Sequence, residues 1–309
     1  MMYFTRLFAA WATVCCLVAP AVAWNGTGHR IVAAIAYERL TPKVRARVDD
    51  LLRRHPDYAA VFVKDAPTDL AARARAAFLT TANWPDMIRA GDARFYDETR
   101  RDAVSTPLLP GFPDMGRHAG WHFIDIPYTP DGPAGPAPAT PNILTELERI
   151  LREIKSPPSE QQIFYDLPWL EHLVGDVHQP LHCTSRFLRS QPKGDAGGNL
   201  VFIVPGRTLH SLWDDALGTD SSDEYVIRYA AKATAAHPEG NAAEAPKIWA
   251  GESFKLDLSN VYTFGPETGS REHPIALPNG YVDNVTSVSE QRIAVAGYRL
   301  AAVLNDLLR

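Results

Sequence analysis

Apolar residues recur every three to four positions through much of the chain, which is the pattern of helices with one buried face. This pattern predicts helices over residues 29–40, 42–52, 141–154, 161–177 and 288–308. Thr41 before Pro42 is typical of an N-cap followed by proline in the first turn. Pro168 is expected to interrupt the helix at 161–177, because proline has no backbone N–H to donate.

Only one segment shows the pattern of β-strands. Residues 200–204 and 208–210 are rich in β-formers and flank a Pro-Gly-Arg turn, which predicts a hairpin. Long connections rich in proline and glycine lie at 101–120, 127–141, 191–199 and 262–281. Loops of this length in a compact domain usually carry function. No repeat or change in composition divides the chain, so we expect a mainly α, single-domain fold with one or two short β-hairpins.

The first 23 residues have the pattern of a cleaved export signal. Arg6 precedes an uncharged, mostly apolar run at 7–18, and Ala21-Val22-Ala23 is a small-x-small cleavage site. The run is too short to cross a bilayer as a helix, and no later stretch approaches the necessary length, so no membrane span is expected. We therefore expect an exported protein, periplasmic or secreted, with residues 24–309 as its single domain.

Charge and cysteine content narrow the possible chemistry. The 309 residues carry a formal net charge of −5, which argues against a protein that holds duplex nucleic acid by overall positive charge. Removing residues 1–23 takes away Cys15 and Cys16 and leaves only Cys183. No intramolecular disulfide can then form, and a metal site of several thiolates is excluded. We expect Cys183 to be a buried free thiol.

Histidine and aspartate recur at spacings that suit a metal site. His172 and Asp176 are four residues apart, and His210 and Asp214 repeat that spacing, so each pair shares a helix face. His182 follows the first pair directly after a helix-ending proline. Neutral imidazole and carboxylate are the usual zinc donors where sulfur is absent. Such an N/O-only zinc site favours hydrolysis over a purely structural role.

Six motifs together carry a resemblance to a known family. They are Trp24-Asn-Gly-Thr-Gly-His29, Asn83-Trp84-Pro85-Asp86, Trp121-His122-Phe123-Ile124-Asp125, the segment from His172 to His182, Gly197-Gly198-Asn199, and Leu209-His210-Ser-Leu-Trp-Asp214. In this order they resemble the zinc-dependent single-strand-specific nucleases, a branch of the phospholipase C/nuclease fold. The resemblance implies that residues 24–309 are a single catalytic nuclease domain.

The resemblance also implies a cluster of three zinc ions. One ion would be held by a set of four residues, namely Asp86, His122, His172 and Asp176. Asp176 would bridge to a second ion, held also by His29 and by the α-amino nitrogen and carbonyl oxygen of Trp24. A third ion would be held by His182, His210 and Asp214. Since a free α-amino group has a pKa near 8, a metal ion displaces its proton far more easily than that of a lysine. The uncleaved precursor is therefore expected to have an incomplete site.

The same resemblance implies a substrate and a reaction. The substrates would be single-stranded DNA and RNA, cut to 5′-phosphorylated products, with 3′-nucleotidase activity in addition. Asp86 would orient the attacking water, and Arg89 would stabilise negative charge on the phosphate. Phe123 would stack on a base, and Asn199 would donate a hydrogen bond in the cleft. We expect a monomer with no stable protein partner.

Two other functions remain open. A phospholipase C acting on phosphatidylcholine-type lipids shares the metal chemistry. That branch favours Glu as the last ligand and a longer gap from the terminal Trp to the first His. Here the last ligand is Asp214, and only five positions separate Trp24 from His29, so both features favour a nuclease. A non-catalytic zinc-binding protein would need a filled coordination sphere with no open position.

Overall fold

Ten α-helices and four very short strands make up the regular structure of the described residues. The computed structural model describes residues 24–132, 134–240 and 245–309, so the predicted export signal at 1–23 lies outside them. The helices are α1 (Gly26–Arg39), α2 (Pro42–Arg53), α3 (Leu70–Thr81), α4 (Trp84–Arg89), α5 (Ile143–Lys155), α6 (Glu160–Asp176), α7 (Leu209–Asp214), α8 (Asp223–Ala236), α9 (Pro246–Leu256) and α10 (Tyr281–Leu307). Short 3₁₀ turns at Ala119–His122 (η2) and Pro180–His182 (η3) and wider π-type turns at Tyr58–Phe62 (η1) and Asp257–Val261 (η4) complete the set. The mainly α fold predicted from the sequence is confirmed.

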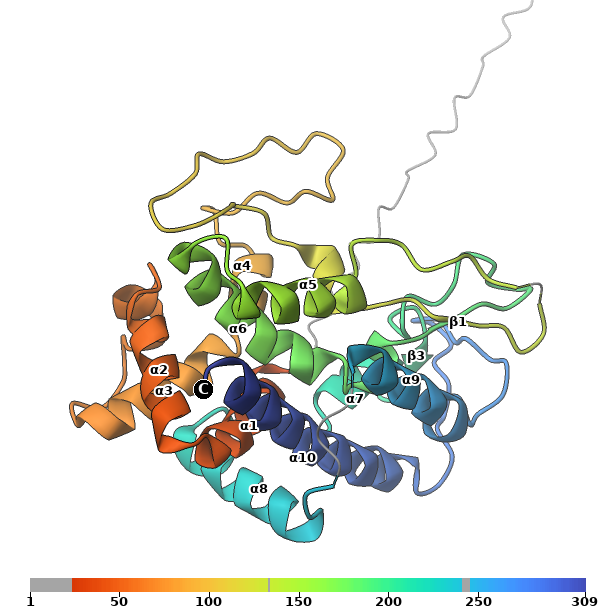
Figure 1. The fold of residues 1–309 in the computed structure, drawn as a ribbon. Coiled ribbons are helices and arrows are strands. Elements are labelled where there is room, and N and C mark those ends of the chain that lie inside the picture. Colours follow the sequence, from red (N-terminus) through yellow and green to blue (C-terminus); the bar gives the residue numbers. More distant parts are fainter. Residues whose placement is uncertain (1–23, 133, 241–244) are drawn as a thin grey trace, which may run out of the picture.

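Helix α6 lies in the middle of the molecule, with α5 on one side and α1 and α10 on the other (Figure 1). Every residue from Ile163 to Asp176 is buried. A helix that is apolar nearly all round has to be enclosed by other elements, and α2, α3 and α4 also pack against α6. The end of α6 therefore lies in the interior, where its last polar residues are shielded from water.

Helix α1 rests on the last helix of the chain. Its residues from Thr27 to Tyr37 are buried except Arg30, and its main packing partners are α10 and α8. Asn305, near the end of α10, connects that helix to the end of α1. Its side-chain amide donates to the carbonyl of Arg39 (3.0 Å) and accepts from the N–H of Thr41 (2.9 Å). The first and last helices thus form one packed layer, which supports α6.

Most of the predicted helices are confirmed, with differences at their ends. Thr41 caps α2 as expected, accepting from the N–H of Val44. The interruption expected at Pro168 is wrong, because α6 continues through it. Dense packing on all sides of α6 offsets the lost hydrogen bond, which costs about 3 kcal/mol. The last helix begins at Tyr281, seven residues before the predicted start.

The strands form two separate two-stranded sheets. Strands β3 (Phe202–Ile203) and β4 (Arg207–Thr208) pair antiparallel, which confirms one predicted hairpin. The expectation that His210 extends this hairpin is wrong, because α7 already begins at Leu209. Strands β1 (Pro127–Tyr128) and β2 (Ser185–Arg186) pair in parallel and were not predicted. None of the described helices combines the length and apolar character required to cross a membrane.

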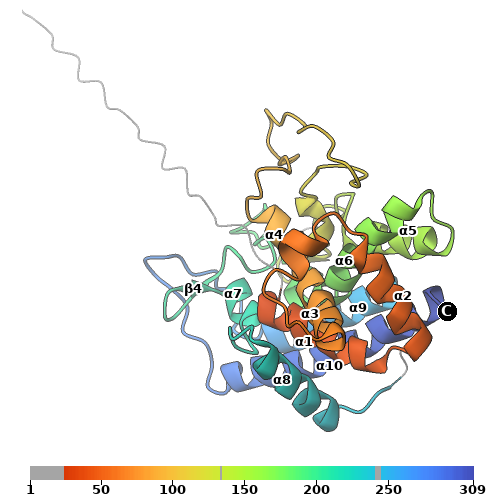
Figure 2. The same ribbon diagram turned by 90° about the vertical axis from the view of Figure 1, so that its left-hand side faces the viewer.

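Residues 97–116 form a long loop that projects from the helices beyond α4 (Figure 2). Two backbone hydrogen bonds close its base. The N–H of Tyr96 donates to the carbonyl of Met115 (2.9 Å), and the N–H of Arg117 donates to the carbonyl of Tyr96 (3.1 Å). The loop is therefore fixed where it leaves and rejoins the body of the protein.

Candidate metal centre and cleft

Three groups of histidine and aspartate side chains come together in the structure. Within each group, the candidate ligand atoms lie within 4.8 Å of one another. The groups are His29, His172 and Asp176; Asp86, His122 and His172; and His182, His210 and Asp214. All eight side chains predicted as metal ligands are among them. They come from α1, α4, η2, α6, η3 and α7, so the chain folds to gather residues up to 185 positions apart.

Asp176 lies where the groups meet. Its Oδ2 atom is 3.1 Å from both His122 Nδ1 and His172 Nε2. Its Oδ1 atom is 3.3 Å from His29 Nε2 and 3.8 Å from His182 Nδ1. The rings of His29 and His172 stack with their centroids 3.8 Å apart. A carboxylate with imidazole nitrogens on both oxygens is suited to share two cations.

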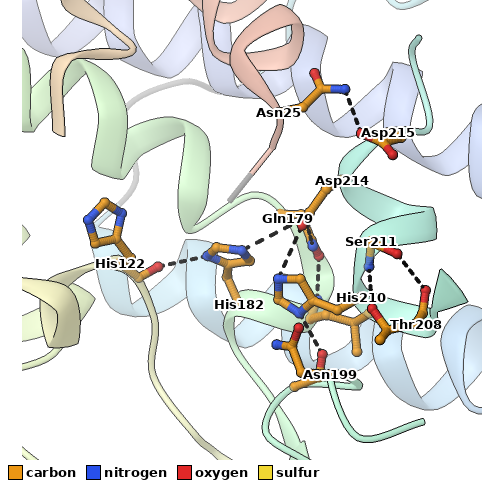
Figure 3. Close-up of polar contacts among 12 residues, drawn as sticks. Asn25, His122, Gln179, His182, Asn199, Thr208, His210, Ser211, Asp214 and Asp215 are labelled. Carbon is orange, nitrogen blue, oxygen red and sulfur yellow. Dashed lines mark hydrogen bonds and ion pairs between the residues drawn. The ribbon is translucent and has the colours of Figure 1, made fainter. Parts of the chain in front are cut away.

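Backbone carbonyls fix the orientation of three of the imidazole rings. Nδ1 of His172 donates to Ala82 O (2.7 Å), and Nδ1 of His182 donates to His122 O (2.8 Å; Figure 3). Nδ1 of His210 donates to Gly197 O (2.6 Å). Because a carbonyl only accepts, each Nδ1 carries the proton and leaves the Nε2 lone pair for a ligand.

Several ligand atoms are buried without a hydrogen-bond partner among the described residues. They are His29 Nε2, both oxygens of Asp86, His122 Nε2, Asp176 Oδ1, His182 Nε2 and His210 Nε2. A buried polar atom that makes no hydrogen bond costs about 1–3 kcal/mol. Metal cations bound by nitrogen and oxygen would satisfy these atoms together. The residues present therefore fit a metal centre, and their N/O donor set suits zinc.

Burial and neighbouring charges together determine the pKa values of the ligand side chains. It lowers the pKa of His122 and of His210 to about 3, with smaller contributions from Arg89 and His182 respectively. These imidazoles are therefore neutral at physiological pH, as metal binding requires. Burial also opposes charge on Asp176, but the surrounding imidazoles outweigh it and hold its pKa well below the usual range. Burial raises the pKa of Asp214 well above its usual value.

Trp24 is held tightly at the start of the described chain. Its indole Nε1 donates to Gly175 O (3.1 Å), and its side chain is fully buried. The next residue, Asn25, donates its backbone N–H to Asp214 O (3.2 Å) and caps α1 with its side chain. Trp24 therefore lies between the ends of α6 and α7, next to their ligands. Whether its main-chain atoms bind metal stays a prediction.

Sequence reasoning missed three residues that support the ligands. A Cβ atom on Gly175 would lie 2.7 Å from the Nδ1 atom of His29, so only glycine leaves room for that ring. The side-chain amide of Gln179 donates to Asp214 Oδ1 (2.7 Å; Figure 3). Gly197 has φ +59° and supplies the carbonyl that orients His210. The available signal was that Gly175 and Gln179 lie within the ligand-bearing segment from His172 to His182, and that Gly197 lies within the Gly197-Gly198-Asn199 motif.

Replacing Gly197 by alanine is expected to weaken metal binding at the His210 group about 10- to 100-fold. The new Cβ would lie 2.5 Å from Leu181 O, so the carbonyl that orients His210 must shift. Gly206→Ala is the matched control, because its φ is +87° but no atom lies within 4 Å of the added Cβ. Both changes strain the backbone, but only Gly197→Ala should lower the zinc content after titration with a competing chelator. Equal zinc retention in the two variants would contradict the role of Gly197.

A cavity of about 470 Å³ opens beside the metal-ligand groups. His182 and His210 contribute to its wall, and so do all three predicted substrate-binding residues, Arg89, Phe123 and Asn199. The loop at 97–116 and its base add further wall residues, including Asp97, Thr99 and Arg117. The cavity therefore connects the candidate metal centre to the projecting loop.

The predicted substrate-binding side chains differ in how they are held. The Arg89 side chain is 8% exposed, and its NH1 lies 4.0 Å from Asp86 Oδ1. Phe123 is 40% exposed, so its ring is not part of the core. The Asn199 side chain donates to Ala196 O (2.8 Å). Asp125 also lines the cavity and was not singled out; burial and the charge of Asp195 raise its pKa to about 6.

The other histidines and the cysteine lie outside the three groups. His178 points away from them: its Nδ1 donates to Val174 O (2.7 Å), and it accepts from Arg299 (2.9 Å). Cys183 is a buried free thiol, as expected. Burial raises its pKa, so it stays protonated and unreactive.

Comparison with known proteins gives a family match and several similar nucleases, two of which cover nearly the whole chain. The sequence model of the S1/P1 nuclease family matches residues 24–309. Nuclease S1 from Aspergillus oryzae is 23% identical over 97% of this chain and 97% of its own length. Endonuclease 3 from Arabidopsis thaliana is 25% identical over 94% of this chain and 91% of its own length. Endonuclease 5 from the same plant is 31% identical, over 48% of this chain and 54% of its own length.

Proposed function

Because the chain belongs to the S1/P1 nuclease family, we propose that it is an exported zinc enzyme that cuts single-stranded DNA and RNA. The products would carry 5′-phosphates, and 3′-nucleotidase activity would accompany the endonuclease activity. Residues 1–23 would be the export signal and 24–309 the catalytic domain, which agrees with the start of the family match at Trp24. The observation that carries the proposal is the set of unpartnered, buried ligand atoms beside the cavity.

We propose three zinc ions, one for each group of ligands. Zinc, when bound, supplies hydroxide at neutral pH by lowering the pKa of water, and it neutralises negative charge on phosphoryl oxygens. Trp24 would add its α-amino nitrogen and carbonyl oxygen to the group of His29 and Asp176. The role of the protein is then to hold the imidazoles and carboxylates in fixed positions.

The residues of the cavity would bind and orient the substrate. Arg89 would hold the scissile phosphate, because its guanidinium is largely buried and lies only at the limit of ion-pair distance from Asp86. One unpartnered oxygen of Asp86 would accept a hydrogen bond from the attacking water and so orient it. The exposed ring of Phe123 would stack on the adjacent base, and Asn199 would donate a hydrogen bond.

The positions of these residues support the proposed preference for single strands. The ligand side chains are almost fully buried, and the base-stacking ring opens into the same cavity. A paired nucleotide would have to leave its duplex to reach them, and unpairing costs a few kcal/mol. A single strand avoids that cost.

The test uses purified protein that begins at Trp24, with its metal content measured. It is assayed on a single-stranded oligonucleotide, the matching duplex, a 3′-mononucleotide and phosphatidylcholine, each with and without a chelator. We expect chelator-sensitive cleavage of the single strand to 5′-phosphorylated products and little action on the lipid. Faster cleavage of the lipid would assign the enzyme to phospholipase C. A zinc-loaded protein that cleaves nothing would be a binding protein only.

A further inference from the structure

Arg117 is a cationic side chain at the base of the projecting loop. Besides its bond to Tyr96, its backbone N–H donates to the carboxylate of Glu98 (3.0 Å). The same carboxylate accepts from the N–H of Ala119 (3.0 Å). The main chain at Arg117 is therefore held on both sides, although the loop beyond it is long.

Two backbone carbonyls hold one edge of the Arg117 guanidinium. Nε donates to Phe95 O (3.0 Å), and NH2 donates to Asp92 O (3.3 Å). The nearby Asp92 carboxylate is already engaged by Arg94, through hydrogen bonds of 2.6 to 3.1 Å. Because a guanidinium has five N–H donors, three remain beyond the two used here, both of those on NH1 included.

Arg117 makes no ion pair with a carboxylate in the part of the chain that the structure describes. The neighbouring arginines, by contrast, form ion pairs with carboxylates. Arg94 bonds to the carboxylates of Asp57 and Asp92, and Arg100 pairs with Asp102. Arg117 is thus left without a direct carboxylate partner among the described residues, while its position is fixed by neutral carbonyls. Such a side chain is preorganised to bind an anion.

Arg117 and the candidate metal centre line the same cavity. Phe123, Arg89 and Thr99 line that cavity too. Asp97 is an acidic residue of this wall, but its carboxylate accepts hydrogen bonds from the N–H and hydroxyl of Thr99. A strand whose base stacks on Phe123 can therefore extend along the cavity toward Arg117.

We infer that Arg117 forms a second phosphate subsite, which binds the phosphodiester of the nucleotide next to the one that is cut. The inference rests on the proposed nuclease function. A 3′-mononucleotide has one phosphate and cannot fill both subsites. The subsite would therefore favour oligonucleotides over mononucleotides, and Arg117 would be a specificity-determining residue.

The test compares Arg117→Gln with Arg100→Gln. Both remove one positive charge from the same region, but Arg100 is exposed, pairs with Asp102 and does not line the cavity. For each protein, kcat/KM is measured on a single-stranded oligonucleotide and on a 3′-mononucleotide. Losing a charge-assisted hydrogen bond should lower the ratio of the two values about tenfold in Arg117→Gln. Arg100→Gln should keep the wild-type ratio.

A binding measurement gives a second readout. With a cleavage-resistant phosphorothioate oligonucleotide, affinity is measured at several salt concentrations. Arg117→Gln should reduce the slope of log affinity against log salt by about 0.7, the value for one phosphate contact on a single strand. Arg117→Lys keeps the charge and should recover most of that slope.

Different results contradict different parts of the inference. Because both substrates are assayed on one sample, partial unfolding lowers both values and leaves their ratio unchanged. An equal loss on both substrates with an unchanged salt slope would overturn the second subsite and leave the nuclease function intact. A wild-type protein that cleaves no nucleic acid would overturn the proposed function, and this inference with it.

Discussion

Asp176→Asn is expected to lower kcat on single-stranded oligonucleotides at least about a thousandfold and to reduce the zinc content. The carboxylate lies within 3.3 Å of nitrogens from His29, His122 and His172. Asparagine keeps the shape but removes the negative charge that two neighbouring cations would share. Its amide N–H groups could also donate hydrogen bonds to imidazole lone pairs and so compete with metal ions for them.

Asp166→Asn is the matched control, because Asp166 is also a buried aspartate of α6. Asp166 pairs with Arg149 (3.1 Å), and Arg149 keeps Glu146 and Glu153 as partners when that charge is removed. The control should therefore lower the melting temperature but retain zinc and cleavage. Zinc content per chain is measured by elemental analysis, and activity is measured by oligonucleotide cleavage. Full zinc content in Asp176→Asn would disprove the central role of this carboxylate.

A single residue added before Trp24 is expected to lower kcat by about a hundredfold or more and to lower the zinc content. The extra peptide bond converts the α-amino group into an amide, which has no lone pair to give a metal ion. Trp24 cannot move to compensate, because its indole is buried against Gly175 and the next residue bonds to Asp214.

The cleanest version of this experiment uses one sample before and after proteolysis. A protease site is placed so that its cut leaves Trp24 as the first residue. Cutting in the presence of zinc should restore both metal content and activity. If the uncut protein already has full zinc and full activity, the α-amino group is not a ligand.

Part of the ligand set was predictable from the spacing of histidine and aspartate along the sequence. The His172/Asp176 and His210/Asp214 spacings place two side chains on one helix face, and the structure has both pairs within 3.4 Å. The resemblance to the nuclease family then implied which residues would meet. What spacing cannot give is the set of backbone carbonyls that orient the rings, since these depend on loops such as the one at Gly197.

Helices α3, α4, α8 and α9 were not predicted from the sequence. Helix α4 has only six residues, too few to show a period. Helix α8 buries only one valine and two alanines, so its apolar face is weak in the sequence pattern. At Pro168, packing around α6 overrides the local preference of the residue.

Arg117 could not be found from sequence at all. An arginine in a loop rich in proline and charge is most often solvated, and nothing in the neighbouring residues distinguishes it. Its lack of a direct carboxylate partner among the described residues becomes visible only in the structure, where Arg94 and Arg100 pair with the nearby carboxylates.

The packing of α1 on α10 links the candidate metal centre to a distant part of the sequence. His29 is carried by α1, which packs mainly against residues 281–307 of α10. Gly297 of α10 is in such close contact with Ile35 of α1 that an added Cβ would lie 2.4 Å from its side chain. The position of His29 beside Asp176 is therefore coupled to the docking of α10, although no residue of α10 is among the candidate ligands.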